Sequence, residues 1–362
     1  MSVQVGYRKQ FLLGFILMLL LLGVTEIILR IYDYYFPSCS FYDSEAFQNL
    51  DDDLKKTICY DNSKLVWENP PLRLLPSQNF KTININSDGF RGNEIQKNPD
   101  YRIFMIGGST TFGVGSSSDS KTIPAYLQNI IDMNNNDGLN IEVINAGIPK
   151  AFSITEIELI QNKILAYQPD MLIIYDGLND IGYNLKQSDS SDISLFDSII
   201  RQINRGSYYT PKILIQHYFN YKHNTVDVLP FNSSGINEKT LLWKERWGKI
   251  CQQDTNFKTI VILQPFVDTK FKPLSEEEMK YYKHYDSESV SKYYQLYANK
   301  LDELKDSCDL TIDLRDAFAS FSNTIYFDSG HVSDFGNEVV ANQISEKIIP
   351  IILQDIKSKT NQ

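Results

Sequence analysis

Four short blocks of this sequence carry the residue types that acyl transfer requires. Ser109 follows four apolar residues and a pair of glycines, which indicates a serine exposed at the carboxyl end of a buried strand. A serine hydroxyl is nearly inert alone and becomes a nucleophile when a base reaches it. His331 is the candidate base, and Asp328 is the candidate acid that holds the imidazole in its working tautomer. For Ser109 alone, a helix cap or a glycine turn is the alternative.

The same blocks contain hydrogen-bond donors for the oxyanion that forms when a serine attacks a carbonyl. The candidates are the backbone amides of Ser109 and Gly147 and the side-chain amide of Asn179. Gly147 and Asn179 each follow an apolar run typical of a strand, so we expect them at the same sheet edge as Ser109. Loss of one such donor typically costs about a hundredfold or more in rate.

The elements that must position these residues alternate between strand and helix patterns. Apolar runs predict five strands, at residues 102–106, 140–144, 171–175, 259–263 and 310–314. Helices are predicted at residues 122–133, 153–167 and 287–305. This alternation indicates an α/β domain with a doubly wound parallel sheet and helices on both faces.

The domain organisation follows from changes in composition along the chain. We expect a short cytoplasmic N-terminus at residues 1–10, a transmembrane anchor at 11–29, a stalk and lead-in at 31–100 and the catalytic domain at 101–358. Within the lead-in, alternation over residues 80–86 predicts a half-exposed strand. The repeat breaks at residues 183–238, which predicts an insertion over the active site as a lid or as a surface subdomain.

The apolar run at residues 11–29 would form a helix roughly 28 Å long, about the hydrocarbon thickness of a bilayer. Arg8 and Lys9 precede it, which favours a cytoplasmic N-terminus and an extracytoplasmic catalytic domain in a single-pass protein of the cell membrane. Glu26 is expected at the interface. A cleaved signal peptide is the alternative, although the run is long for one and no small-residue cleavage site follows it.

Net charge and cysteine content bear on the binding partners and the disulfides of the protein. The net charge of −10 and the lack of a concentrated basic stretch argue against nucleic acid as a partner. Four cysteines outside the cytoplasm permit two disulfides, and pairing neighbours in sequence predicts Cys39 with Cys59 and Cys251 with Cys308. Four buried free thiols are the alternative.

Taken together, Ser109, Gly147, Gly177-x-Asn179-Asp180 and Asp328-x-x-His331 resemble the SGNH hydrolase superfamily, or GDSL-type esterases, in order and spacing. The resemblance covers residues 101 to about 345 and implies a flavodoxin-like three-layer α/β/α sandwich with a five-stranded parallel sheet. It also implies Ser-His-Asp hydrolysis without metal or organic cofactor, and a structural role for Asp180.

One position departs from that family, because the acidic residue before the nucleophile is replaced by Gly108. The triad is unaffected, but the part that the acid has in the geometry of the loop is put in doubt. The Gly-Gly-Ser-Thr form resembles a membrane-anchored branch, some of whose members are linked to acylation or deacylation of surface polysaccharide.

These observations predict a membrane-anchored extracytoplasmic serine esterase that removes an acyl group, O-acetyl above all, from a carbohydrate, a surface polymer or another small ester. An O-acyltransferase with the same triad and a non-catalytic surface binding protein with the same fold are the alternatives. Oligomeric state and natural substrate stay open.

The remaining candidates have simpler explanations. His217, His223 and His284 are not spaced as metal ligands. The Tyr281-Tyr282 and Tyr293-Tyr294 pairs would stack on sugar rings or, more commonly, pack on a helix face. Ser333 and Asp334 are expected to cap the final helix.

Overall fold

The computed structural model describes residues 6–35, 39, 41–68, 72–135, 138–182, 235–253, 257–284 and 286–360. The chain forms two units, one of residues 1–38 and 186–230, the other of residues 39–185 and 231–362. The predicted insertion at residues 183–238 lies outside the described residues, apart from 235–238 at the start of helix α9 (Ile236–Cys251).

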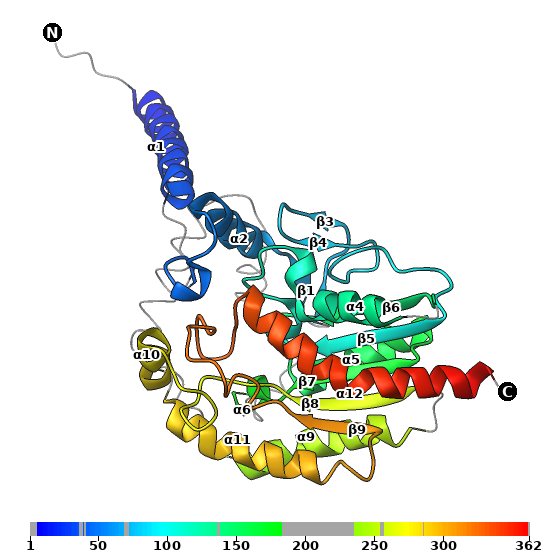
Figure 1. Cartoon of the computed structure of the whole chain (residues 1–362). Helices are drawn as coiled ribbons and strands as arrows, with labels where there is room; N and C mark the ends of the chain where they lie inside the picture. Colours follow the sequence, from blue (N-terminus) through cyan, green and yellow to red (C-terminus); the bar gives the residue numbers. More distant parts are fainter. Residues whose placement is uncertain are drawn as a thin grey trace. The chain divides into compact units, whose positions relative to one another are not determined.

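The second unit is built on a five-stranded parallel sheet (Figure 1). Its strands are β5 (Tyr101–Gly107), β6 (Ile141–Gly147), β7 (Met171–Asp176), β8 (Lys258–Leu263) and β9 (Leu310–Asp313). The spatial order is β6-β5-β7-β8-β9. In order of appearance this is 2-1-3-4-5, the flavodoxin-like order, whose switch point lies between the first and third strands. The predicted fold class is therefore confirmed, and the switch point falls between β5 and β7.

Helices cover both faces of the sheet. One core joins the strands to α4 (Ile123–Asn134) and α12 (Asp334–Thr360), and the other joins them to α5 (Ser153–Asn162), α9 and α11 (Ser287–Asp302) (Figure 1). Alternate residues of β5 serve the two cores, because successive side chains of a strand point to opposite faces. Every residue of β5 and β7 is buried, which explains why both appear in the sequence as continuous apolar runs.

The shorter elements precede the sheet or lie in its connections. They are η1 (Glu45–Phe47), α2 (Asp52–Lys64), β1 (Trp67–Glu68), β2 (Arg73–Leu74), β3 (Gln78–Asn79), β4 (Asn84–Ile85), α3 (Ser109–Phe112), η2 (Asp119–Lys121), η3 (Ile164–Tyr167), α6 (Leu178–Ile181) and α10 (Glu276–His284).

Three predicted elements differ from the observed ones. The strand predicted at 140–144 extends to Gly147, because its pairing with β5 continues as far as Gly107. The helix predicted at 153–167 is divided into α5 and η3, since the backbone of Lys163 leaves the helical region with φ −139°. The single strand predicted at 80–86 is replaced by the hairpin of β3 and β4, whose turn is closed by a hydrogen bond from Phe80 N to Ile83 O.

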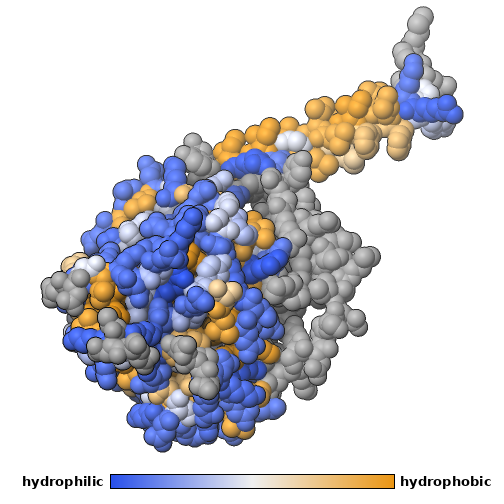
Figure 2. Space-filling model, turned by 90° about the vertical axis from the view of Figure 1, so that its right-hand side faces the viewer, coloured by the Kyte–Doolittle hydropathy of each residue, from blue (hydrophilic) through white to orange (hydrophobic). Residues whose placement is uncertain are grey.

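In the first unit, the described element is helix α1 (Tyr7–Tyr35). Within Tyr7–Tyr32, a window of 18 residues has a mean hydropathy of 2.7, and Figure 2 shows this helix coated almost entirely with hydrophobic side chains. Glu26 forms an ion pair with Arg30 one turn later, at 2.9 Å. The helix is long and apolar enough to cross a membrane, as a signal sequence would also be, so anchoring stays a prediction.

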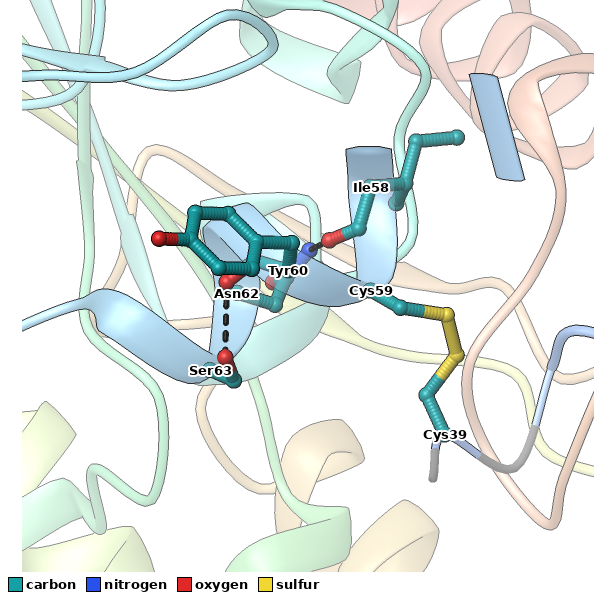
Figure 3. The surroundings of a disulfide bond; sticks show 6 residues. All are labelled: Cys39, Ile58, Cys59, Tyr60, Asn62 and Ser63. Carbon is teal, nitrogen blue, oxygen red and sulfur yellow. Dashed lines mark hydrogen bonds between the residues drawn. A yellow bond between two sulfur atoms is a disulfide. The ribbon is translucent and has the colours of Figure 1, made fainter. Parts of the chain in front are cut away.

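Both predicted disulfides are present, so the alternative of free thiols is wrong. Cys39 is bonded to Cys59 of α2 (Figure 3), with 5.7 Å between their Cα atoms. Cys251, the last residue of α9, is bonded to Cys308, which lies just before β9, with 4.7 Å between Cα atoms. The first bond closes a loop within the lead-in, and the second joins the end of α9 to the segment before β9.

Candidate active site

The candidate nucleophile lies at the switch point of the sheet. β5 ends at Gly107, Gly108 turns the chain, and Ser109 is the first residue of α3. The Ser109 Oγ lies 2.6 Å from His331 Nε2, although the two residues are 222 positions apart in the sequence. The structure therefore brings the predicted nucleophile and base into hydrogen-bond contact, as a serine that needs activation requires.

The second half of the candidate triad is formed within one tight turn. His331 Nδ1 lies 2.7 Å from Asp328 Oδ2. The other carboxylate oxygen of Asp328 accepts hydrogen bonds from the backbone amides of Gly330, at 2.9 Å, and His331, at 2.8 Å. With both oxygens held, the carboxylate fixes the imidazole with Nδ1–H directed at the acid and Nε2 directed at the serine.

Asp328 and His331 each shift the pKa of the other. Burial, the largest influence on His331, lowers the pKa of its imidazole, but the charge and hydrogen bond of Asp328 outweigh burial and raise that pKa above its usual range. For Asp328, burial raises the pKa of the carboxyl, and the His331 charge together with three hydrogen bonds lowers it overall. At neutral pH the acid is therefore ionised and the base titrates above its ordinary pKa.

This shift predicts the acidic limb of the pH profile. A general base must be neutral to accept a proton, so we expect kcat/KM to rise with pH through an apparent pKa above the ordinary value of about 6.5. The measurement is hydrolysis of p-nitrophenyl acetate from pH 5 to 9, with circular dichroism at each pH as the control for folding. A limb centred below 6.5 in folded protein contradicts the assignment.

Asn179 is positioned beside the nucleophile by the turn that leaves β7. Its Nδ2 donates to the Ala151 carbonyl at 2.8 Å, which uses one of the two amide hydrogens. A Cβ atom on Gly108 would lie 2.5 Å from Asn179 Nδ2. The glycine that departs from the family pattern thus leaves the space that the Asn179 amide occupies beside Gly108, the residue before Ser109.

Gly147 is placed differently from the expectation of a loop residue. It ends β6, and a Cβ atom there would lie 2.2 Å from the backbone nitrogen of Phe112, so only glycine allows this strand to pack against α3. Its own N–H donates to Asn145 Oδ1 at 3.0 Å. The oxyanion roles of Ser109, Gly147 and Asn179 all stay predictions.

Asp180 has the structural position that the resemblance implies. Its carboxylate is buried and accepts hydrogen bonds from the backbone amide of Ser153, at 2.9 Å, and from the Ser153 hydroxyl, at 2.5 Å. The guanidinium of Arg246 lies 3.5 Å from the same carboxylate. Asp180 therefore joins the Asn179 turn to the start of α5.

One supporting residue is not evident from the sequence. Arg91, from the lead-in, is buried and donates to the carbonyls of Phe112, at 3.1 Å, and Gly113, at 2.8 Å, at the end of the nucleophile helix. Asn145 Nδ2 also donates to the Phe112 carbonyl, at 3.2 Å. A single arginine in a segment of irregular structure has no pattern that predicts this contact.

The remaining candidate residues lie outside the hydrogen-bonded series of Ser109, His331 and Asp328. Asp334 accepts hydrogen bonds from the backbone and hydroxyl of Ser117 instead of capping α12, so that part of the helix-cap prediction is wrong. The tyrosines support helix packing: Tyr294 is buried and donates to the Gln264 carbonyl at 2.7 Å, while Tyr281 binds Glu277. His217 and His223 lie outside the described residues, and within the described ranges no group of three acidic, histidine or cysteine residues could hold a metal ion.

Comparisons with known proteins find similarity in structure only. No family model matches the sequence, and no curated protein matches it. A lipase/acylhydrolase from Enterococcus faecalis is 16% identical, with 68% of this chain and 95% of that chain covered and a TM-score of 0.42. The acetyl xylan esterase AlAXEase is 15% identical, with 68% and 99% covered and a TM-score of 0.40. An acetylxylan esterase from Geobacillus stearothermophilus is 14% identical, with 72% and 96% covered and a TM-score of 0.36.

These similarities are distant, and they assign neither an activity nor a substrate to this chain.

Proposed function

We propose that the protein is a serine esterase. The observation that carries this proposal is the continuous hydrogen-bonded series from Ser109 through His331 to Asp328, formed at the switch point of a flavodoxin-like sheet. Such a series gives a hydroxyl the base that it needs and gives the base the tautomer that it needs.

The reaction follows from the positions of these atoms. Ser109 Oγ attacks the ester carbonyl carbon while His331 Nε2 takes the hydroxyl proton, and the resulting oxyanion accepts hydrogen bonds from the Ser109 N–H and Asn179 Nδ2. His331 then gives its proton to the departing alcohol, which leaves an acyl-serine. Water, deprotonated by the same imidazole, attacks the acyl-serine, releases the acid and restores the serine hydroxyl.

The finer proposal concerns substrate and location. On the basis of the Gly-Gly-Ser-Thr block and the N-terminal apolar helix, we propose a short acyl group, O-acetyl, on a carbohydrate or surface polymer at the outer side of the cell membrane. The alternative in which a sugar hydroxyl replaces water uses the same acyl-serine, so the acceptor distinguishes the two reactions.

The test uses the full-length chain in detergent micelles, with acetylated xylan as substrate and His331→Ala as the inactive control. Acetate released into solution by the wild-type protein alone supports the esterase. Transfer of the acetyl group to an added oligosaccharide, without release of acetate, identifies an acyltransferase. Neither reaction, in a folded protein that also fails to hydrolyse p-nitrophenyl acetate, contradicts the proposed function and favours a binding protein.

The oxyanion donor provides a graded prediction. Replacing Asn179 by Ala removes one donor, and we expect kcat to fall by about 10²- to 10³-fold with KM changed much less, because the bond strengthens only as charge develops. Steady-state hydrolysis of p-nitrophenyl acetate measures this split. If KM rises by as large a factor as kcat falls, or if kcat does not fall, Asn179 is not an oxyanion donor.

A further inference from the structure

The face of the candidate base rests on a phenylalanine. The ring of Phe327 is stacked on the imidazole of His331, with 5.6 Å between centroids and 14° between planes. Phe327 is buried, and its backbone N–H donates to the His331 carbonyl at 3.1 Å. Asp328 and Ser109 hold the two nitrogens of the imidazole at its edge, and Phe327, stacked on its face, limits tilting of the ring out of that plane.

Phe327 is itself held by the lead-in. Its ring lies 5.3 Å from that of Phe41 and 5.1 Å from that of Phe47, and those two rings are 5.3 Å apart. The three side chains, called the phenylalanine cluster below, are each no more than 4% exposed and form one core with Ile58 and Cys59. Such ring pairs at 5 to 6 Å restrict one another's orientation as well as burying apolar surface.

A disulfide closes the segment that supplies two of these rings. Phe41 and Phe47 lie between Cys39 and Cys59 in the sequence, and Figure 3 shows Cys59 projecting from α2 to meet Cys39. Because the bond fixes both ends of this loop, the loop has far fewer conformations in which the two rings could leave Phe327.

Polar contacts fix the same loop to the chain just ahead of the triad acid. Ser44 Oγ donates to Glu277 Oε1 at 2.5 Å, and the backbone N–H of Glu45 donates to Glu277 Oε2 at 2.8 Å. The hydroxyl of Thr324 donates to Glu45 Oε2 at 2.8 Å. The loop is therefore bound on one side to α10 and on the other to the segment that leads into Phe327 and Asp328.

From these contacts we propose that the disulfide-closed loop of residues 39–59 positions the catalytic base, with Phe327 as the positioning residue that transmits its packing to His331. This inference rests on the proposed function. Loosening the loop would let Phe327 move and let the imidazole tilt, which lowers the fraction of molecules in which Nε2 is aligned with Ser109. A misalignment of this kind lowers the rate of proton transfer and leaves binding of the ester almost unchanged.

The chain contains its own matched control, a second disulfide in the same domain. We compare Cys39→Ala/Cys59→Ala with Cys251→Ala/Cys308→Ala in the full-length protein in detergent, and add Phe47→Leu, which removes one ring of the cluster but keeps an apolar side chain. The readouts are kcat and KM for p-nitrophenyl acetate and the rate at which a fluorophosphonate labels Ser109, both at a temperature where circular dichroism shows each variant folded.

The expected result is a fall in kcat and in labelling rate of about ten- to a hundredfold for Cys39→Ala/Cys59→Ala and for Phe47→Leu, with KM close to that of the wild type. Cys251→Ala/Cys308→Ala is expected to lose thermal stability and to keep the wild-type kcat. We also expect the acidic limb to move to higher pH in the first two variants. In the wild type, burial lowers the pKa of His331, and a loosened cluster would admit water and so remove part of that lowering.

Two outcomes overturn the inference, and they are distinguishable. In the first outcome, the wild type is labelled, and Cys39→Ala/Cys59→Ala and Phe47→Leu are folded and react at the wild-type rate. The loop then has no part in positioning the base, and the esterase proposal stands. If the folded wild type is itself unlabelled and inactive, the proposed function fails and the inference fails with it. Should Cys39→Ala/Cys59→Ala not fold, Phe47→Leu decides between these outcomes.

Discussion

Ser109→Ala is expected to lower kcat for ester hydrolysis by about 10⁴-fold or more, since the acyl-serine cannot form and only binding and the oxyanion donors remain. The Ser109 Oγ lies 2.6 Å from His331 Nε2 and is the proposed nucleophile. The variant should also lose all labelling by a fluorophosphonate, because that probe transfers its phosphonyl group to an activated serine oxygen with departure of fluoride.

The chain offers a matched control for this substitution. Ser117 lies eight residues further on, and its hydroxyl binds the carboxylate of Asp334, away from the triad. Ser117→Ala makes the same chemical change without touching the nucleophile, so we expect it to keep its labelling and kcat within about threefold of the wild type. Activity and labelling of Ser109→Ala at the wild-type level contradict the assigned nucleophile. Equal loss in both indicates damage to the fold.

The contacts among Ser109, His331 and Asp328 could be predicted from the sequence because each of these candidates is a chemically distinctive residue in a short block next to a strand or a turn. The strands were predictable for a related reason: β7 and β8 are buried along nearly their whole length, so their sequences are almost continuously apolar. The order of the strands, and therefore the switch point between β5 and β7, after which Ser109 and Asn179 follow, required the structure for confirmation.

What escaped prediction are contacts made by ordinary residues with distant partners. Nothing in the local sequence of Arg91 indicates that its guanidinium binds carbonyls at the end of α3, and Phe41 and Phe47 show no periodicity that would direct them to Phe327. The end of β6 was missed because Asn-Ala-Gly is typical of a loop, whereas pairing between Gly147 and Gly107 extends the strand. In each case the structure depends on a contact with a residue far away in the sequence, which the local sequence does not reveal.

A buried ion pair beneath the triad is the second place where a large effect is expected. Lys272 Nζ lies 2.6 Å from Glu278 Oε2, and the two side chains are 2% and 0% exposed. The other carboxylate oxygen of Glu278 accepts hydrogen bonds from the backbone amides of Ile325, at 2.9 Å, and Tyr326, at 3.1 Å. These two residues lead directly into Phe327 and Asp328, so the pair supports the segment that carries the candidate acid and base.

Lys272→Met is expected to destabilise the protein by about 3–5 kcal/mol, since it leaves the Glu278 carboxylate buried without a compensating charge. The lost ammonium also donates to the Asn323 carbonyl at 2.9 Å, which would be left without this donor. Thermal unfolding followed by circular dichroism measures the effect. The control is Lys292→Met, because Lys292 pairs with Glu288 on the surface, where the side chains are 65% and 69% exposed and such pairs contribute little.

The double variant Lys272→Met/Glu278→Gln separates the cost of an unpaired charge from the loss of packing. Glutamine keeps an oxygen that can accept from Ile325 and Tyr326 but carries no charge, so we expect the double variant to unfold at a higher temperature than Lys272→Met alone. If both variants unfold at the same temperature, the unpaired carboxylate is not the source of the instability. If Lys272→Met is as stable as Lys292→Met, the buried pair does not hold the segment that carries the triad, and the geometry of Asp328 and His331 must depend on the contacts of the phenylalanine cluster instead.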